Sequence, residues 1–151
     1  MADDRISDIP DMMKAVRSIA VAGVSSHKSK FGSAAYRELK KLGYRVWAIH
    51  PTMSTFEGDP CYSSPSELPA TPDCIVLSLA PAGAVDVIRA AAKKGIRRVW
   101  FQRGADFSEA IAEAQRLGLA VVSGRCILMY TDKVRSIHRL HRFFAKLFGK
   151  Y

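Results

Sequence analysis

The chain has 151 residues and a formal net charge of +9, with 23 Lys and Arg against 14 Asp and Glu. A chain of this length can bury roughly 68–70% of its unfolded surface, enough for one domain with a substantial core. No window approaches the ~20 apolar residues of a membrane span, and no signal sequence is present, so we expect one cytoplasmic domain over residues 1–151. The cysteines form no C-x-x-C pair, so we expect neither a disulfide framework nor a zinc site.

The first predicted unit consists of a strand, a polar loop, a helix and a second strand. Residues 19–24 are small or β-branched, which is typical of a strand buried on both faces of a parallel sheet. Residues 33–42 carry apolar side chains at helical spacing, and Gly43 after them is a common helix stop. The second strand, residues 44–49, is closed by Pro51, which cannot donate a ladder hydrogen bond. This order predicts a βαβ unit.

The loop between this first strand and its helix is a candidate phosphate site. Helix N-termini attract anions through unpaired backbone N–H groups and the helix dipole. Lys28 and Lys30 add positive charge to the loop, and glycines let the backbone approach a ligand without an intervening Cβ. The candidate ligand-binding residues of this loop are Gly23, Val24, Ser25, Lys30, Phe31 and Gly32.

A dinucleotide-binding enzyme is the main alternative for such a unit. Its fingerprint is G-x-G-x-x-G followed by an acidic residue at the end of the second strand, which holds a ribose hydroxyl. Here Ser25 and Lys28 stand where the second and third glycines would be, and the second strand ends in Ile49-His50-Pro51. An NAD(P)-dependent oxidoreductase therefore remains the alternative rather than the favoured interpretation.

Strands and helices alternate in the rest of the chain. Residues 52–72 contain four prolines and are predicted as a loop around one helical turn at residues 63–68. Together with a short helix between residues 3 and 14, the pattern predicts a Rossmann-like open parallel sheet of about five strands with helices on both faces. The remaining strands are expected at residues 74–79, 96–101 and 119–122, and the remaining helices at residues 84–94 and 107–117.

The C-terminal segment is predicted to form a basic amphipathic helix. Residues 131–151 hold six Lys or Arg against one Asp, and apolar side chains form one stripe over residues 132–148. The simplest interpretation is a final helix packed on the sheet with a solvated basic face. The alternatives are contact with a protein partner or a second copy, a membrane surface, or nucleic acid. The lack of stacking aromatics among the cations weighs against nucleic acid.

Ligands of open α/β sheets bind beyond the carboxyl ends of the strands, at the point where strand order reverses. Arg125 is well placed for phosphate because its planar guanidinium can donate two hydrogen bonds, although a solvated loop arginine is the alternative. Cys126 beside it is either a reactive thiol near the ligand or a small buried side chain. The candidates from these later strand ends are His50, Pro51, Leu79, Pro81, Gln102, Gly104, Arg125 and Cys126.

Several short motifs occur in a fixed order along residues 19–130. They are G-x-S at Gly23 and Ser25, K-x-G at Lys30 and Gly32, L-x-x-x-G-Y-x-V from Leu39 to Val46, the proline at 51, Val99-Trp100-Phe101-Gln102 followed by Gly104, and Arg125-Cys126-Ile127. In their order and spacing these motifs together resemble one family, the small CoA-binding domain proteins related to the N-terminal domain of the succinyl-CoA synthetase alpha subunit.

The resemblance implies that the five strand ends surround coenzyme A, with the phosphates near the first loop and the adenine and pantetheine arms along the second, third and fourth. His50 departs from the family, which usually has asparagine before the proline. The related synthetase carries its phosphorylated histidine in a second domain, for which this chain lacks the length. Since no G-x-S-x-G or H-E-x-x-H motif occurs either, we expect binding of CoA or an acyl-CoA without catalysis.

Overall fold

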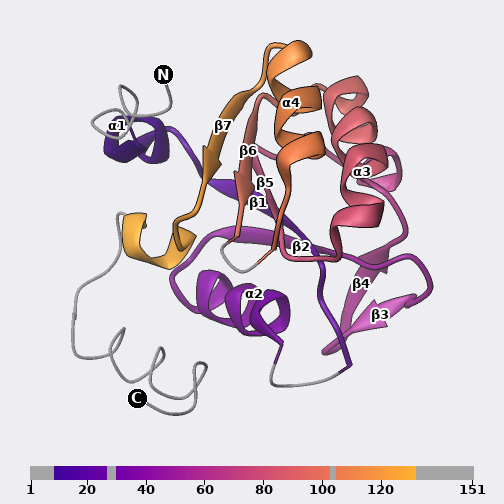
Figure 1. Ribbon diagram of the computed structural model, residues 1–151. Coiled ribbons are helices and arrows are strands. Elements are labelled where there is room, and N and C mark those ends of the chain that lie inside the picture. Colours follow the sequence, from indigo (N-terminus) through magenta and orange to yellow (C-terminus); the bar gives the residue numbers. More distant parts are fainter. Residues whose placement is uncertain (1–8, 27–29, 103–104, 132–151) are drawn as a thin grey trace, which may run out of the picture.

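The computed structural model describes residues 9–26, 30–102 and 105–131. In these ranges one sheet lies between two layers of helices (Figure 1). The strands are β1 (Ser18–Ala22), β2 (Arg45–Ile49), β3 (Thr55–Phe56), β4 (Asp59–Tyr62), β5 (Cys74–Leu77), β6 (Arg98–Phe101) and β7 (Ala120–Ser123). The helices are α1 (Ile9–Lys14), α2 (Phe31–Lys41), α3 (Pro81–Lys94) and α4 (Ser108–Arg116), with 3-10 turns η2 (Pro65–Glu67) and η3 (Ile127–Tyr130).

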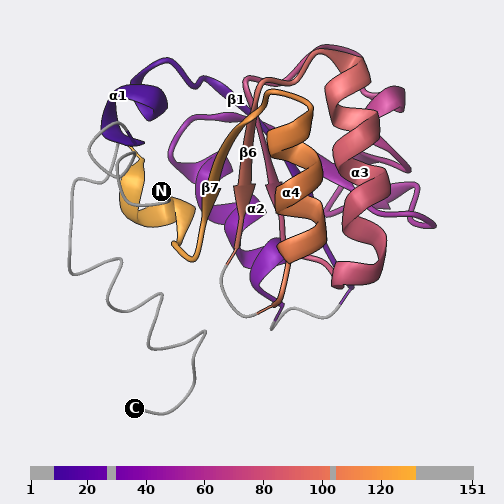
Figure 2. The ribbon, with the colours of Figure 1, turned by 45° about the horizontal axis from the view of Figure 1, so that its top comes forward.

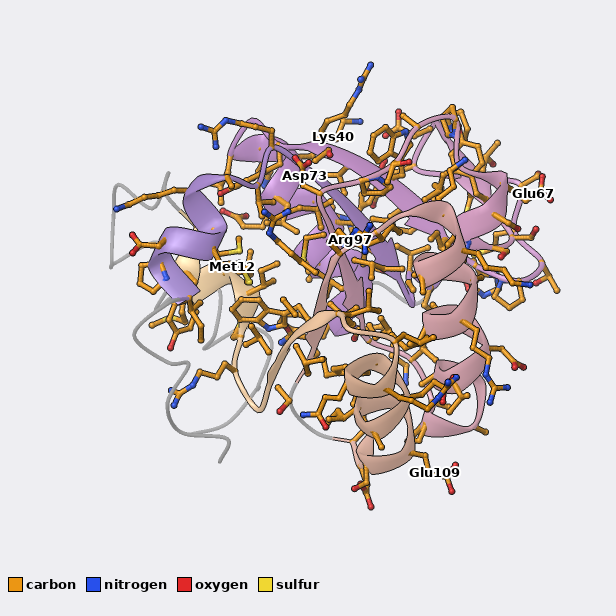
Figure 3. All side chains as sticks on the ribbon, turned by 90° about the horizontal axis from the view of Figure 1, so that it is seen from above. Met12, Lys40, Glu67, Asp73, Arg97 and Glu109 are labelled. Carbon is orange, nitrogen blue, oxygen red and sulfur yellow. The ribbon has the colours of Figure 1, made fainter. Side chains whose placement is uncertain are left out.

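The sheet has seven strands in the order β3-β4-β2-β1-β5-β6-β7. The central strand β1 pairs in parallel with β2 on one side and β5 on the other, so that Val21 lies between Ala48 and Val76. The five predicted strands are all present and parallel, which confirms the Rossmann-like fold. Figure 3 looks onto the amino edge of this sheet, where Asp73 and Arg97 lie; the carboxyl edge is on the opposite side.

Two hydrophobic clusters fill the space between the sheet and its helices. One cluster joins α1, α2 and η3 to the sheet and contains Leu39, Trp100 and Ile127, all of which are fully buried. The other joins α3, α4 and η2 to the opposite face and contains Ile88 and Phe101. Figures 1 and 2 show α3 and α4 side by side, with α2 on the other side of the sheet. The carboxyl edge is thus flanked by helix starts on both faces.

The proline-rich segment differs from the prediction. A β3–β4 hairpin adds two strands beside β2, and its turn consists of Glu57 at φ 50° and Gly58 at φ 84°, as a two-residue hairpin loop requires. The predicted helical turn is confirmed as η2, where the Ser64 hydroxyl accepts a hydrogen bond from the Ser66 N–H at 3.3 Å. The hairpin was missed because its strands are short and Pro60 within β4 argues against a strand.

Polar contacts join this hairpin to α2. The Tyr36 hydroxyl, on a side chain that is 1% exposed, donates to the Asp59 carboxylate at 2.5 Å. Lys40 from the next turn of α2 pairs with the same carboxylate, and Arg37 pairs with Glu57. The hydrogen bonds from Lys40 and Tyr36 lower the pKa of Asp59, whereas burial, followed by the bond to Asp59, raises the pKa of Tyr36.

We predict that Asp59→Asn flattens the acid dependence of stability. Because its folded-state pKa is lowered, the Asp59 carboxylate stabilises the fold above its ordinary pKa of 3.8, and this contribution is lost as the pH falls through the lower folded-state value. Urea unfolding between pH 7 and about pH 2 should therefore show a smaller acid-induced loss of unfolding free energy in the variant. Tyr36→Phe removes one donor and should give a smaller change of the same sign. Identical profiles for parent and Asp59→Asn would contradict the prediction.

Candidate functional site

The strand order reverses beside β1, which places the expected ligand position at the carboxyl ends of β1 and β5. The chain leaves β1 through α2 towards β2 on one side, and it leaves β5 through α3 towards β6 on the other. Backbone hydrogen bonds hold the two ends together with β2: the Gly23 N–H donates to the Ile49 carbonyl at 3.2 Å, and the Ser78 N–H donates to the Ala22 carbonyl at 2.8 Å. In open α/β sheets ligands bind at such a position.

Two glycines bring three backbone segments into direct contact here. Gly23 has φ +121°, and a Cβ built on it would lie 2.0 Å from the Ser78 carbonyl oxygen. A Cβ on Gly32, in the first turn of α2, would lie 2.2 Å from the Gly23 carbonyl oxygen. Real Cβ atoms do not approach this closely, so only glycine fits at either position. The contact fixes the start of α2 against the ends of β1 and β5.

The Ser33 hydroxyl ties the first loop to α2. This side chain is fully buried, donates to the Ser25 carbonyl oxygen and accepts from the Ser25 N–H, both at 2.8 Å. Val24 between Gly23 and Ser25 is 1% exposed and packs in the core with the half-buried Phe31. The predicted loop residues thus lie together, while the role of the Ser33 side chain was not predicted. Its signal in the sequence is a small hydroxyl in the first turn of a helix that follows a glycine-containing loop.

The helix starts along the carboxyl edge differ in their capping. At α2 the N-cap is the exposed Lys30, and no side chain caps the helix; the same holds for α3, whose N-cap is Ala80 before Pro81. At α4 the Asp106 carboxylate accepts from the Ser108 N–H at 3.0 Å and also bonds the Ser108 hydroxyl. The α4 start therefore already has its own anion. The two helices beside the strand reversal lack one.

His50 after β2 organises its own loop. Its N–H donates to the Tyr62 carbonyl at 2.9 Å, and its Nδ1 accepts from the N–H groups of Thr52 and Met53, both at 3.1 Å. Nδ1 therefore carries a lone pair, and the ring hydrogen is on Nε2. An asparagine oxygen can accept from the N–H two residues later in the same way, so His50 makes the turn contact that an asparagine at this position would make. The neighbouring Pro51 is exposed.

The candidates on the next two strands have structural contacts. Leu79 is half-buried and packs against the second cluster, and Pro81 is the exposed first residue of α3. Gln102 is 5% exposed; its N–H donates to the Leu77 carbonyl at 3.0 Å and its Oε1 accepts from the Ile127 N–H at 3.2 Å. Gln102 thus joins β5 and β6 to η3. Gly104 lies outside the described residues, as do Lys28 and all but the first residue of the segment 131–151 for which a helix is predicted.

Arg125 and Cys126 lie at the β7 end of the carboxyl edge, away from the first loop. The Arg125 guanidinium donates to the Tyr130 hydroxyl at 3.4 Å, and the backbone carbonyl of Arg125 accepts from the Trp100 indole N–H at 2.8 Å. Cys126 is 8% exposed and belongs to the first core cluster. The packing interpretation of Cys126 is favoured over the reactive one. Burial raises the pKa of the other two cysteines, to about 12 for Cys74 and in the same direction for Cys61.

Within the described ranges, none of the helices has the length and apolar character needed to cross a membrane. Nor do three or more His, Cys, Asp or Glu side chains gather there in a way that could hold a metal ion. At the start of α2, first-turn backbone N–H groups lie beside the exposed Lys30. The strand order and the helices on both faces of the sheet define an α/β domain of the Rossmann type.

Residues 17–132 match the family described as CoA binding domain, and the chain belongs to this family. The match begins one residue before β1 and ends one residue after the last described residue. It therefore includes every strand of the sheet and every candidate ligand residue named above. The resemblance inferred from short motifs is confirmed.

Solved structures with the same fold include proteins of undescribed function and one enzyme. A hypothetical protein from Pyrococcus horikoshii OT3 is 27% identical with a TM-score of 0.77, over 82% of this chain and 87% of that one. A conserved hypothetical protein from Pyrococcus furiosus is 33% identical with a TM-score of 0.71, over 76% and 99%. A dinucleotide-forming acetyl-coenzyme A synthetase from Ca. Korarchaeum cryptofilum is 28% identical with a TM-score of 0.64, over 70% of this chain and 25% of the enzyme.

We predict that Gly32→Ala destabilises the fold by about 1–3 kcal/mol, since the added methyl group has no room beside the Gly23 carbonyl. Gly83→Ala is the matched control: it lies in α3, where the nearest atom to an added Cβ is a Leu79 methyl carbon at 3.7 Å. The control should stabilise the helix by about 0.5–1 kcal/mol. Urea unfolding of both variants measures the difference. Equal stability of Gly32→Ala and the parent would contradict the close packing.

Proposed function

We propose that the chain binds coenzyme A or an acyl-CoA at the carboxyl edge, with the diphosphate or the 3′-phosphate at the start of α2. The observation that carries the proposal is the uncapped N-terminus of α2 with Lys30 at its N-cap, held against Gly23 at the strand reversal, in a chain of the CoA binding domain family. Binding is the proposed activity. The resemblance to the synthetase alpha subunit supports it, because CoA is that family's ligand.

The α2 start has the chemistry of a phosphate site. The backbone N–H groups of Gly32 and Ser33 lie in the first turn of α2, where the helix dipole favours negative charge. Lys30 is exposed and adds a full positive charge directly before them. Ser25 closes the site from the loop side, since its backbone is fixed to the Ser33 hydroxyl. Hydrogen bonds to charged phosphate oxygens are stronger than neutral ones.

The two arms of CoA then extend to opposite sides of this phosphate site. In Rossmann-type domains the adenosine ribose lies near the end of the second strand, which is β2 with His50 and Pro51 in this chain. The pantetheine arm then extends over Leu79, Pro81 and Gln102, which follow the ends of β5 and β6. Arg125 follows β7, three strand spacings or about 14 Å from β1. We therefore leave Arg125 out of the proposed phosphate site.

We predict that CoA binds more tightly than NADH, NADPH or a short DNA duplex. The residues after β2 are His50 and Pro51, which cannot replace the ribose-binding carboxylate of an NAD site. Isothermal titration calorimetry with the full-length protein, at one ionic strength, compares the dissociation constants of the four ligands. Tighter binding of NADPH than of CoA would favour the oxidoreductase alternative. Tighter binding of the duplex would favour nucleic acid, and no binding of CoA at millimolar concentration would contradict the proposal outright.

We predict that Lys30→Ala weakens CoA binding roughly tenfold to a hundredfold, because a hydrogen bond to a charged group contributes about 1.5–3 kcal/mol. Lys41→Ala is the matched control, since Lys41 is an exposed lysine at the opposite end of α2. Titrating dephospho-CoA, which lacks the 3′-phosphate, in parallel shows which phosphate Lys30 contacts. If the ratio of CoA affinity to dephospho-CoA affinity is the same in Lys30→Ala as in the parent, Lys30 contacts the diphosphate. If this ratio is lower in the variant, Lys30 contacts the 3′-phosphate. Parental affinity in a folded Lys30→Ala protein would make Lys30 a solvated loop lysine.

A further inference from the structure

A pocket of about 210 Å³ lies at the carboxyl ends of β6 and β7, beside α4. Its apolar part comes from the side chains of Phe101, Phe107 and Ile111. Gln102, Ala105, Ser123 and Gly124 complete the lining, and the last three of these are exposed at its rim. The pocket thus combines two buried aromatic side chains and the half-buried Ile111 with a polar rim that opens at the edge of the sheet where the ligand is proposed to lie.

Contacts with the surrounding core hold the pocket walls in place. The rings of Phe101 and Phe107 pack against each other with centroids 5.3 Å apart and planes tilted by 45°, and both side chains are at most 5% exposed. The Ile111 N–H donates to the Phe107 carbonyl at 2.8 Å as α4 begins. Gln102 is fixed by its bond to the Ile127 N–H. A pocket with walls held in this way is formed before any ligand arrives.

The size of the pocket limits what it can hold. Pockets for whole drug-sized ligands are typically about 300–1,000 Å³, so 210 Å³ is too small for most of a CoA molecule. A dry apolar cavity of about 150 Å³ accepts benzene, which has six carbon atoms. The pocket therefore fits one small apolar group of roughly six to eight carbons, attached to a ligand that extends out through the rim.

The position of the pocket agrees with the pantetheine end of CoA. The β6–β7 gap is two strand spacings, about 10 Å, from the β1–β5 gap where the phosphates are proposed to bind. The pantetheine arm is comparable to about four residues of extended chain, which span roughly 13–14 Å. The adenosine is directed the other way, over β2. The thiol end therefore reaches the pocket when the phosphate lies at the start of α2.

We propose that this pocket binds the acyl group of a short- or medium-chain acyl-CoA, which makes the acyl thioester rather than free CoA the preferred ligand. The inference rests on the proposed CoA site and adds its substrate class. Asp106 beside the pocket already occupies the start of α4 with a carboxylate, so a negatively charged acyl group such as a succinyl group is disfavoured there. A neutral aliphatic chain has no such conflict.

Calorimetric titration of an acyl-CoA series tests this inference. Dissociation constants for CoA and for its acetyl, butyryl, hexanoyl, octanoyl, decanoyl and succinyl thioesters are measured on the full-length protein. Each buried methylene should tighten binding by about fourfold. We expect this increase up to hexanoyl- or octanoyl-CoA and no further increase at decanoyl-CoA. Succinyl-CoA should bind more weakly than butyryl-CoA.

Variants of α4 link the chain-length effect to the pocket. Ile111→Trp fills the pocket and should bring the ratio of hexanoyl-CoA to CoA affinity close to one. Ala112→Trp, on an exposed neighbouring residue of the same helix, should keep the parental ratio. Ile111→Ala enlarges the pocket and should shift the preferred acyl group to a longer chain, which keeps the test available if the tryptophan variant does not fold.

The outcomes separate this inference from the proposed function. Absence of CoA binding by the parent protein rejects the proposed function and with it the acyl site. Binding of CoA with equal affinity for all thioesters rejects the acyl site alone. A chain-length effect that persists in folded Ile111→Trp places the acyl group elsewhere and also rejects the pocket. If Ile111→Trp weakens the binding of every ligand equally, CoA included, another part of CoA occupies the pocket and the acyl site is rejected.

Discussion

The site depends on direct backbone contact at Gly23 and Gly32. A helix normally stays a side chain's width away from the strand it packs on, and here the start of α2 reaches the end of β1 with no side chain between. This approach brings the first-turn N–H groups to the position where strand order reverses. An added methyl group would push the helix start away from the sheet and would move these N–H groups out of the place proposed for the phosphate. Protein stability and the proposed ligand geometry thus rest on the same contact.

Neutral hydrogen bonds build the rest of the edge. Ser33 fixes the first loop and His50 fixes the loop after β2. The ion pairs among the described residues lie elsewhere: on α1, between α2 and the hairpin, and around Glu113 of α4, which pairs with Arg116 of the same helix and with Arg89 of α3. In the last group, Arg116 and Arg89 lower the pKa of Glu113 to about 2. Among the described residues of this edge, Lys30 and Arg125 carry positive charge, and Asp106 beside α4 carries negative charge.

The parallel sheet was predictable because its five parallel core strands are short apolar runs, and β1, β5 and β6 are each followed by a helix that ends beside a glycine. The candidate loop was predictable because its residues Gly23, Lys30 and Gly32 lie close together in the sequence as well as in space. What could not be predicted depends on partners distant in the chain. Pro60 argues against a strand in the sequence, yet β4 forms because it pairs with β2 and β3. Phe101, Ile111 and Ser123 form a pocket only once β6, α4 and β7 are assembled.

The β3–β4 hairpin also covers the edge of the sheet beside β2, where another chain could otherwise pair with it. Without it, β2 would be the outermost strand and would expose a full row of unpaired backbone N–H and C=O groups, which is a template for association with other chains. With it, the outermost strand is β3, which has only two residues and runs antiparallel to the rest. Exposed sheet edges are commonly protected by such short strands. The hairpin therefore guards this side of the sheet against aggregation.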